Sequence, residues 1–189
     1  TWLMELNISK CKIIHFGKKN PHHNYHLTDS LTNTQLTLEK STSERDLGII
    51  LTSNLKSSTQ VNLAASKANR MLGLMKRTFV SRELHIWIKI YKTYIRPLLE
   101  FAISSWNPYL LKDIKILEQV QKRVTKIPHS TRQLKYEDRC KKFQITFLTK
   151  RRIRGDLIQQ YKLLNGFDEI NWYSPPTILP PRGSHRGYH

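Results

Sequence analysis

The chain has 189 residues, of which 39% are apolar, and its 32 Lys and Arg against 14 Asp and Glu give it a formal charge of +18. This length suits one ordinary domain or two small ones with a modest core, and it excludes a wholly disordered chain. Because the sequence has no run of about 18 apolar residues and no apolar segment after a basic start, we expect neither a membrane span nor a signal peptide.

The first third of the chain predicts short β-strands separated by turn-forming residues. Strands are expected at about 11–16, 25–27, 35–38 and 47–51, and the cluster GKKNP comes after the first of them. Strands this short need a cover for their apolar face. The pattern therefore predicts a small antiparallel β element that packs on the rest of the chain.

From about Ser58 the apolar residues recur at helical spacing. The first helix carries one apolar stripe, and the basic residues Arg70 and Arg77 lie on the opposite side. The stripe consists of Val61, Ala65, Ala68, Leu72, Met75 and Phe79. A second helix from about Leu84 repeats this design, and Pro97 predicts a kink near Arg96.

Further helices are expected toward the C-terminus. A third helix is expected at about 113–127, with Leu117, Val120, Val124 and Ile127 facing inward. The linker PHSTRQ then leads to a helical region at about 136–165, which Gly166 ends. Residues 167–189 predict a disordered basic tail. The fold class is therefore α+β, mainly α, with a small antiparallel β element before a three-helix bundle and further C-terminal helices.

The positive charge is concentrated in the last two-thirds of the sequence. Residues 1–60 carry 7 bases and 5 acids, residues 61–127 carry 13 and 4, and residues 128–189 carry 12 and 5. Such a chain repels itself unless a polyanion binds it. An anionic membrane surface would attract the same charge, but nucleic acid is the expected partner and we expect no membrane partner.

Cysteine usage predicts a reducing compartment. Cys11 and Cys140 are far apart, and reduced thiols are the simpler interpretation for two cysteines in so basic a chain. We therefore expect a location in the nucleus or the cytoplasm. One thiol and scattered histidines do not match the ligand spacing of a zinc site, so we expect no metal site in this chain.

Six segments follow one another in an informative order and spacing over about residues 6–166. In order they are LNISKCKIIHFG, RDLGIIL, KANRMLGLMKRTF, YIRPLLEFAISSWNP, LEQVQKRVTK and RRIRGDLIQQYKLLNG. Together they resemble the reverse transcriptases of non-LTR, LINE-like retrotransposons of the jockey and CR1 type.

The resemblance implies a domain order. Residues 1–56 would be the distal palm with a primer-grip-like segment at Leu47, Gly48 and Ile49, and Lys10 would fall on a palm lysine that assists catalysis. Residues 57–127 would be the thumb, which closes on the template–primer duplex, and residues 128–166 a post-thumb region. The family also implies preceding palm, fingers and endonuclease domains as partners, and Mg²⁺ for the parent polymerase.

The carboxylates of nucleotidyl transfer are missing from this sequence. Two metal ions need several carboxylates close together, and the family supplies them as an aromatic-x-Asp-Asp string and an earlier aspartate. Neither is present, and the six aspartates stand apart, which predicts solvated charges and helix caps. We therefore expect no polymerase activity from this chain alone, and a general acid such as Lys10 contributes only when metals are in place.

Basic helix residues are the candidate phosphate contacts. A solvated helix face explains any single one, whereas the charge of the whole set favours a polyanion. The candidates are Lys67, Arg70, Arg77, Lys89, Lys115, Lys122, Lys126, Arg151, Arg152 and Arg154. Trp87, Tyr91, Tyr94 and Trp106 could stack on bases, but the apolar stripe favours core packing for Tyr91.

Two functions fit these patterns. The first is the C-terminal fragment of an RNA-directed DNA polymerase, and the second is a non-catalytic nucleic-acid-binding remnant of a mobile element. A purely structural helical adaptor leaves the charge unexplained.

Overall fold

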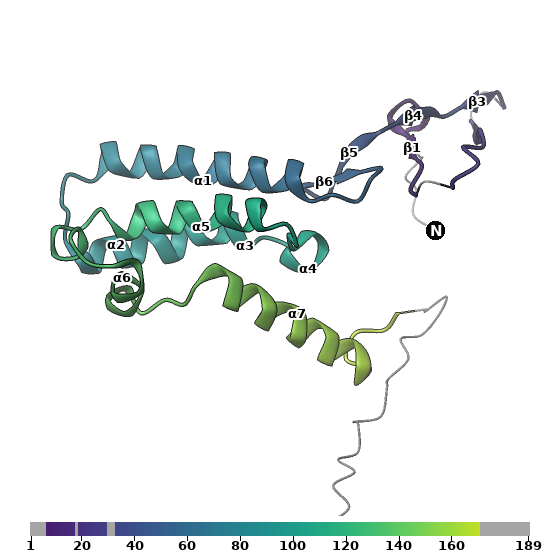
Figure 1. Cartoon of the computed structure of the whole chain (residues 1–189). Helices are drawn as coiled ribbons and strands as arrows, with labels where there is room; N and C mark the ends of the chain where they lie inside the picture. Colours follow the sequence, from purple (N-terminus) through teal and green to yellow (C-terminus); the bar gives the residue numbers. More distant parts are fainter. Residues whose placement is uncertain (1–6, 18, 30–32, 171–189) are drawn as a thin grey trace, which may run out of the picture.

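The computed structural model describes residues 7–17, 19–29 and 33–170. Within them, the expected mainly α, α+β fold with a small β element is confirmed (Figure 1). Helix α1 (Ser58–Thr78) lies along one side of a helical bundle. Beneath it lie α5 (Leu111–Thr125) and the segment formed by α2 (Leu84–Ile90) and α3 (Arg96–Glu100), and α7 (Leu148–Leu164) lies on the other side. Of the predicted tail, residues 171–189 lie outside the described part.

The β-strands form three separate pairs. Strands β2 (His26–Thr28) and β3 (Gln35–Thr37) are antiparallel, as are β5 (Ser43–Asp46) and β6 (Ile49–Thr52). Strands β1 (Lys12–Ile14) and β4 (Glu39–Ser41) instead pair in parallel. The predicted strand at 47–51 starts two residues later in the structure, because Leu47 and Gly48 form the turn between β5 and β6.

Both residues of this turn have positive φ, +45° at Leu47 and +88° at Gly48. A two-residue hairpin turn with two positive φ values matches the twist of its strands. The hairpin is fixed to the bundle, because the Ile50 amide donates to Gln60 Oε1 at 3.0 Å and Ile49 is buried in the core.

Helix α1 (Ser58–Thr78) forms as its pattern predicts. Five of the six stripe residues are buried, and Phe79 comes directly after the end of the helix. The small side chains Ala64, Ala65 and Ala68 are all at most 5% exposed, so the helix approaches its neighbours α3 and α5 closely.

The second predicted helix is interrupted where a kink was expected. Helix α2 (Leu84–Ile90) runs into a π-helical turn (Tyr91–Ile95), and α3 (Arg96–Glu100) comes next. Pro97 has no amide hydrogen and cannot continue the regular α-helical ladder, and the Arg96 amide instead donates to the Tyr91 carbonyl.

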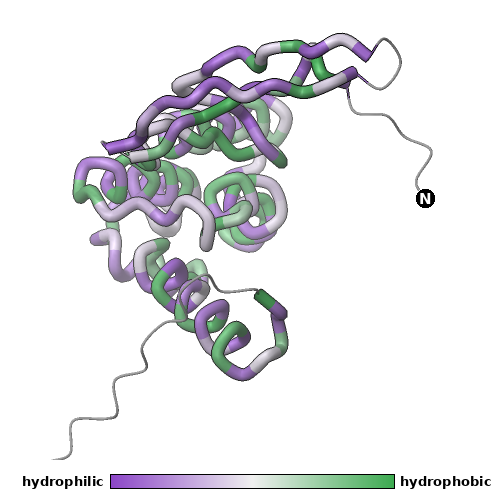
Figure 2. Tube along the Cα trace, turned by 90° about the vertical axis from the view of Figure 1, so that its right-hand side faces the viewer, coloured by the Kyte–Doolittle hydropathy of each residue, from purple (hydrophilic) through white to green (hydrophobic). Residues whose placement is uncertain are grey.

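The remaining helices are α4 (Ile103–Trp106), α5 (Leu111–Thr125), α6 (Tyr136–Phe143) and α7 (Leu148–Leu164), with single-turn helices at Ile8–Lys10 and His129–Thr131. The single helical region expected at 136–165 is therefore two helices. Gln144 ends α6 in the left-handed conformation with φ +52°. Such helix ends are usually formed by glycine or asparagine, so the sequence does not predict this one. Figure 2 shows hydrophobic and hydrophilic residues alternating along α7, on the outer side of the bundle.

A buried amide joins three helices in the core. Gln121 on α5 accepts a hydrogen bond from the Tyr91 hydroxyl and donates to Tyr136 Oη at 2.9 Å and to the Thr146 carbonyl at 3.1 Å. Tyr136 in turn donates to Glu118. Burial raises the pKa of both tyrosines above the ordinary range, so they remain neutral donors.

We expect Gln121→Ala to lower the free energy of unfolding by about 3 kcal/mol, because it leaves a buried hydroxyl and a carbonyl without partners. Urea unfolding followed by circular dichroism measures the change. Gln119→Ala on the exposed face of the same helix is the matched control and should cost less than about 0.5 kcal/mol. Equal losses for the two variants would contradict the role of this amide.

Candidate nucleic-acid interface

Three of the candidate cations line one groove between α1 and α3. Lys67, Arg70 and Arg77 surround an apolar floor of Met71, Leu74 and Leu98, and the hollow measures about 440 Å³. The side chains of the three cations make no hydrogen bond or ion pair with any other described residue. Cations beside an apolar surface are poorly screened and attract phosphate more strongly than cations in open solvent.

A second hollow of about 260 Å³ continues this groove toward the β5–β6 hairpin. Lys67 and Leu98 line both hollows, and the second adds Arg45, Gly48 and Phe101. A Cβ at Gly48 would lie 3.5 Å from the Phe101 ring. The hairpin turn that resembles a primer grip is thus adjacent to the basic residues of α1. Leu47, at the tip of that turn, is 86% exposed.

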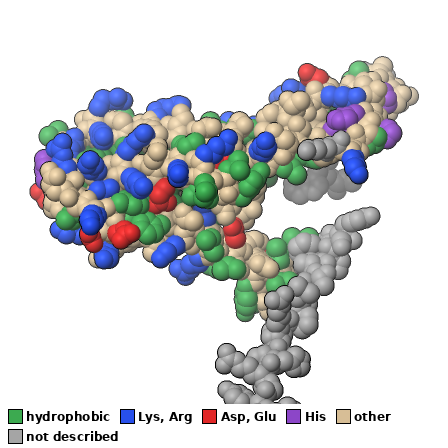
Figure 3. All heavy atoms as spheres, viewed as in Figure 1, with side chains coloured by type: hydrophobic (Ala, Val, Ile, Leu, Met, Phe, Trp, Pro, Cys, Tyr) green, Lys and Arg blue, Asp and Glu red, His purple; other side chains and the backbone are tan. Residues whose placement is uncertain are grey.

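The cations of α5 and α2 do not join this groove. Lys115 and Lys122 are exposed on α5, and Lys126 is exposed directly after its end. Lys122 Nζ lies 5.1 Å from the centre of the Tyr136 ring. Lys89 is exposed on α2 and lines neither hollow. Lys and Arg side chains cover α1 and the end of the bundle where α1 and α5 finish (Figure 3). The predicted thumb cations therefore occupy more than one surface.

Two of the three cations predicted on α7 are bonded to other residues of the protein. Arg152 is 2% exposed, donates to the Leu99 carbonyl at 3.2 Å and lies over the Trp106 ring, so the prediction of a phosphate contact there is wrong. Burial lowers the pKa of its guanidinium. Arg151 donates to both oxygens of Glu100, at 2.5 and 3.1 Å, and this pairing raises its pKa. Arg154 remains exposed.

One of the acids is buried and has a structural role. Asp113 is not the solvated charge expected from the sequence: it is 1% exposed and accepts a hydrogen bond from Ser58 Oγ at 2.5 Å, which ties the start of α1 to α5.

Lys10 is exposed at the end of a single-turn helix. Among residues 7–17, 19–29 and 33–170, no three His, Cys, Asp or Glu side chains are grouped so that they could hold a metal ion.

Most of the candidate stacking aromatics belong to the core. Trp87 and Tyr91 are fully buried and Trp106 is 5% exposed, which confirms core packing for Tyr91. Tyr94 is the exposed member of this group. Base stacking by the other three is therefore ruled out in this conformation.

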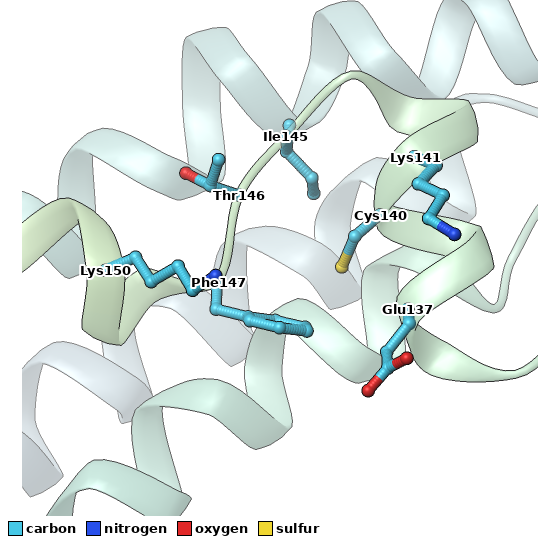
Figure 4. A pocket seen from close by; sticks show the side chains of 7 residues that line it. All are labelled: Glu137, Cys140, Lys141, Ile145, Thr146, Phe147 and Lys150. Atoms are coloured by element: carbon cyan, nitrogen blue, oxygen red, sulfur yellow. The ribbon is translucent and has the colours of Figure 1, made fainter.

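A separate hollow of about 360 Å³ lies between α6 and the start of α7 (Figure 4). The sulfur of Cys140 points into it, beside the Phe147 ring, and Glu137, Lys141 and Lys150 lie around it. Burial raises the pKa of this thiol, so it is a weak nucleophile at neutral pH. Cys11 and Cys140 are both free thiols.

Several basic residues at the hollows are not identified by sequence pattern. Arg45 stands outside any helical stripe, although the Leu47-Gly48 turn beside it is a local indication of a hairpin. Other cations gather at the ends of α1 and α5, namely Lys76, Arg82, Arg123 and Arg132, together with the predicted Lys126. Only the packing of the two helices brings this set together.

No family model, no curated protein and no solved structure matches this chain. Within the part of the chain that the structure describes, no helix is long and apolar enough to cross a membrane.

We expect Cys140 to be alkylated slowly in the folded protein, because its thiol is buried and its pKa is raised. In a Cys11→Ser variant, the rate of iodoacetamide labelling at Cys140 should keep rising with pH beyond the ordinary thiol pKa of about 8.5. Mass spectrometry of quenched samples measures this rate, and the same protein in urea is the control. A native rate that already levels off below that pH would contradict the raised pKa.

Proposed function

We propose that this chain is the C-terminal part of a non-LTR-type RNA-directed DNA polymerase and that it grips the template–primer duplex. One observation supports this most directly: the groove lined by Lys67, Arg70 and Arg77 continues into the hollow beside Gly48. In the proposed order, residues 1–56 belong to the distal palm, residues 57–127 to the thumb and residues 128–166 to a post-thumb region.

The grip acts through phosphates rather than bases. The side chains of Lys67, Arg70 and Arg77 release condensed counterions when they meet backbone phosphates, so binding weakens steeply as salt rises. The apolar floor of Met71, Leu74 and Leu98 packs against sugars and excludes water from the contacts. Because phosphate contacts carry no sequence information, the chain binds hybrids of different sequence with similar affinity.

The β5–β6 turn positions the end of the duplex. Leu47 has a positive φ, which a bulky side chain rarely adopts, and it is held exposed next to the groove. Strained residues of this kind concentrate at ligand contacts, where the surrounding structure holds them in place. Leu47 therefore packs against the primer terminus, while Gly48 supplies the second positive φ of the turn, +88°, which residues with a side chain rarely adopt.

Catalysis in this proposal belongs to a preceding palm. Its carboxylates would hold Mg²⁺, and the present chain contributes the grip and, at most, Lys10 as an auxiliary proton donor. The partners are RNA, DNA and the palm, fingers and endonuclease domains of the same polyprotein. The setting is the nucleus or the cytoplasm.

A non-catalytic role in nucleic-acid binding is the second candidate. It requires only the groove, because Lys67, Arg70 and Arg77 bind phosphate without any polymerase chemistry. A genomic reading frame that continues upstream into an aromatic-x-Asp-Asp string favours the polymerase instead.

We expect the triple variant Lys67→Gln, Arg70→Gln, Arg77→Gln to weaken binding of a blunt RNA–DNA hybrid. The log–log dependence of affinity on salt should become flatter by about 2.5, because each lost duplex phosphate contact removes about 0.9. Fluorescence anisotropy titrations between low and moderate salt measure both quantities.

The matched control removes three exposed cations that lie outside the groove, by Lys56→Gln, Lys112→Gln and Lys162→Gln. Its salt dependence should stay close to that of the unaltered chain. If both triple variants weaken binding equally, net charge rather than the groove holds the nucleic acid, and the proposed grip is wrong.

A further inference from the structure

A second cationic hollow lies on the other flank of α1. It measures about 420 Å³ and is lined by Ile127 and five basic residues, which are Lys76, Arg82, Arg123, Lys126 and Arg132. No acid of the described part of the chain lines it. Lys76 of the hollow and Arg77 of the groove are consecutive residues of α1, about a quarter of a turn apart around the helix, so the two sites are close together.

Two of the five cations are held rigidly in place. Arg82 donates to the Lys76 carbonyl at 3.2 Å and to the Phe79 carbonyl, and its guanidinium lies 5.4 Å from the centre of the Trp87 ring. Arg123 donates to Asn69 Oδ1 of α1 at 3.0 Å. Their charges are therefore fixed at the hollow before any ligand arrives, which lowers the entropic cost of binding.

The other three cations have no partner for their charge among the described residues. The side chains of Lys76, Lys126 and Arg132 make no hydrogen bond or ion pair with the described residues, and the described ion pairs involve none of the five. The C-terminal ends of α1 and α5 adjoin the hollow, because Lys76 and Arg123 in their last turns line it. Two helix ends supply about one negative charge in total, which cannot balance five positive ones.

We propose that this hollow binds the sugar–phosphate backbone of an unpaired nucleic-acid strand, which crosses α1 from the duplex held in the groove. The inference rests on the proposed function in taking the polyanion to be nucleic acid. Arg70 and Arg77, which line the groove, are exposed on α1 and mark the path between the two sites.

The arrangement of the cations favours a single strand over a duplex. The hollow and the groove are similar in volume, but five of the six residues that line the hollow are cations, and they converge on it from α1, α5 and the loops after them. Cations that converge on one space can surround a single phosphodiester chain, whereas a duplex meets cations that lie along one face. The Trp87 ring is fully buried beneath Arg82 and cannot stack on a base. Contacts are therefore to phosphate, without base preference.

The test compares three probes by fluorescence anisotropy: a blunt RNA–DNA hybrid, the same hybrid with an unpaired extension of about ten nucleotides, and that extension alone. The hollow variant is Lys76→Gln, Lys126→Gln, Arg132→Gln, which leaves the structural bonds of Arg82 and Arg123 intact. The groove variant (Lys67, Arg70 and Arg77 to Gln) and the scattered variant (Lys56, Lys112 and Lys162 to Gln) are the comparisons.

We expect the hollow variant to bind the tailed hybrid and the single strand at least about tenfold more weakly at about 0.1 M salt, with a salt slope flatter by about 2. Its affinity for the blunt hybrid should stay within about twofold of that of the unaltered chain, because the duplex does not enter the hollow and so loses no phosphate contact. The groove variant should instead lose affinity for both hybrids.

Other outcomes overturn the inference or the proposed function separately. If the hollow variant loses affinity equally for the blunt and the tailed hybrid, the hollow is part of the duplex grip. If it loses affinity for no probe, the five cations only balance the charge of the helix ends. Either result overturns the single-strand site. A lower melting temperature without a binding change would also assign these cations a structural role. If the unaltered chain binds the single strand through the hollow but not the blunt hybrid, the duplex grip fails and the hollow stands.

Discussion

The close packing of α1 against α3 and α5 is the contact on which the rest of the structure depends. Ala64, Ala65 and Ala68 are small and buried, so the helix axes approach one another and both flanks of α1 become narrow hollows. Its apolar stripe thus positions charge as well as forming the core. Larger side chains at these three positions would move α1 away from α3 and α5. The cations of α1 would then be separated from those of α5, and both hollows would be wider.

The buried polar groups explain how a strongly basic chain keeps its helices in register. Asp113 accepts from Ser58 at one end of the α1–α5 pair, and Gln121 joins α5 to the π-helical turn and to α6. Glu100 engages Arg151 and thereby fixes α7 against α3. These acids are used inside the protein, which leaves the excess of positive charge on the outside, where a polyanion can meet it.

The proposed duplex groove and the proposed single-strand hollow use similar residues in different ways. In the groove, Lys67, Arg70 and Arg77 surround an apolar floor that is open along α1. In the hollow, hydrogen bonds fix Arg82 and Arg123 in advance, and the cations converge from two helices and the loops after them. A strand that crosses α1 between them would be held on both sides of one rigid helix, so the two proposals describe one continuous path for phosphate.

Local periodicity was enough to predict α1, the break near Pro97, α5 and the residues that face the core, because apolar residues at helical spacing must be buried together. It was also enough to place Lys67, Arg70 and Arg77 on one helix. Tertiary structure alone decided that Arg152 is buried, that Arg151 meets Glu100 and that cations of α1 and α5 converge on one hollow. These depend on which residues far apart in sequence become neighbours, and a charge pattern along one helix contains no information about the helix beside it.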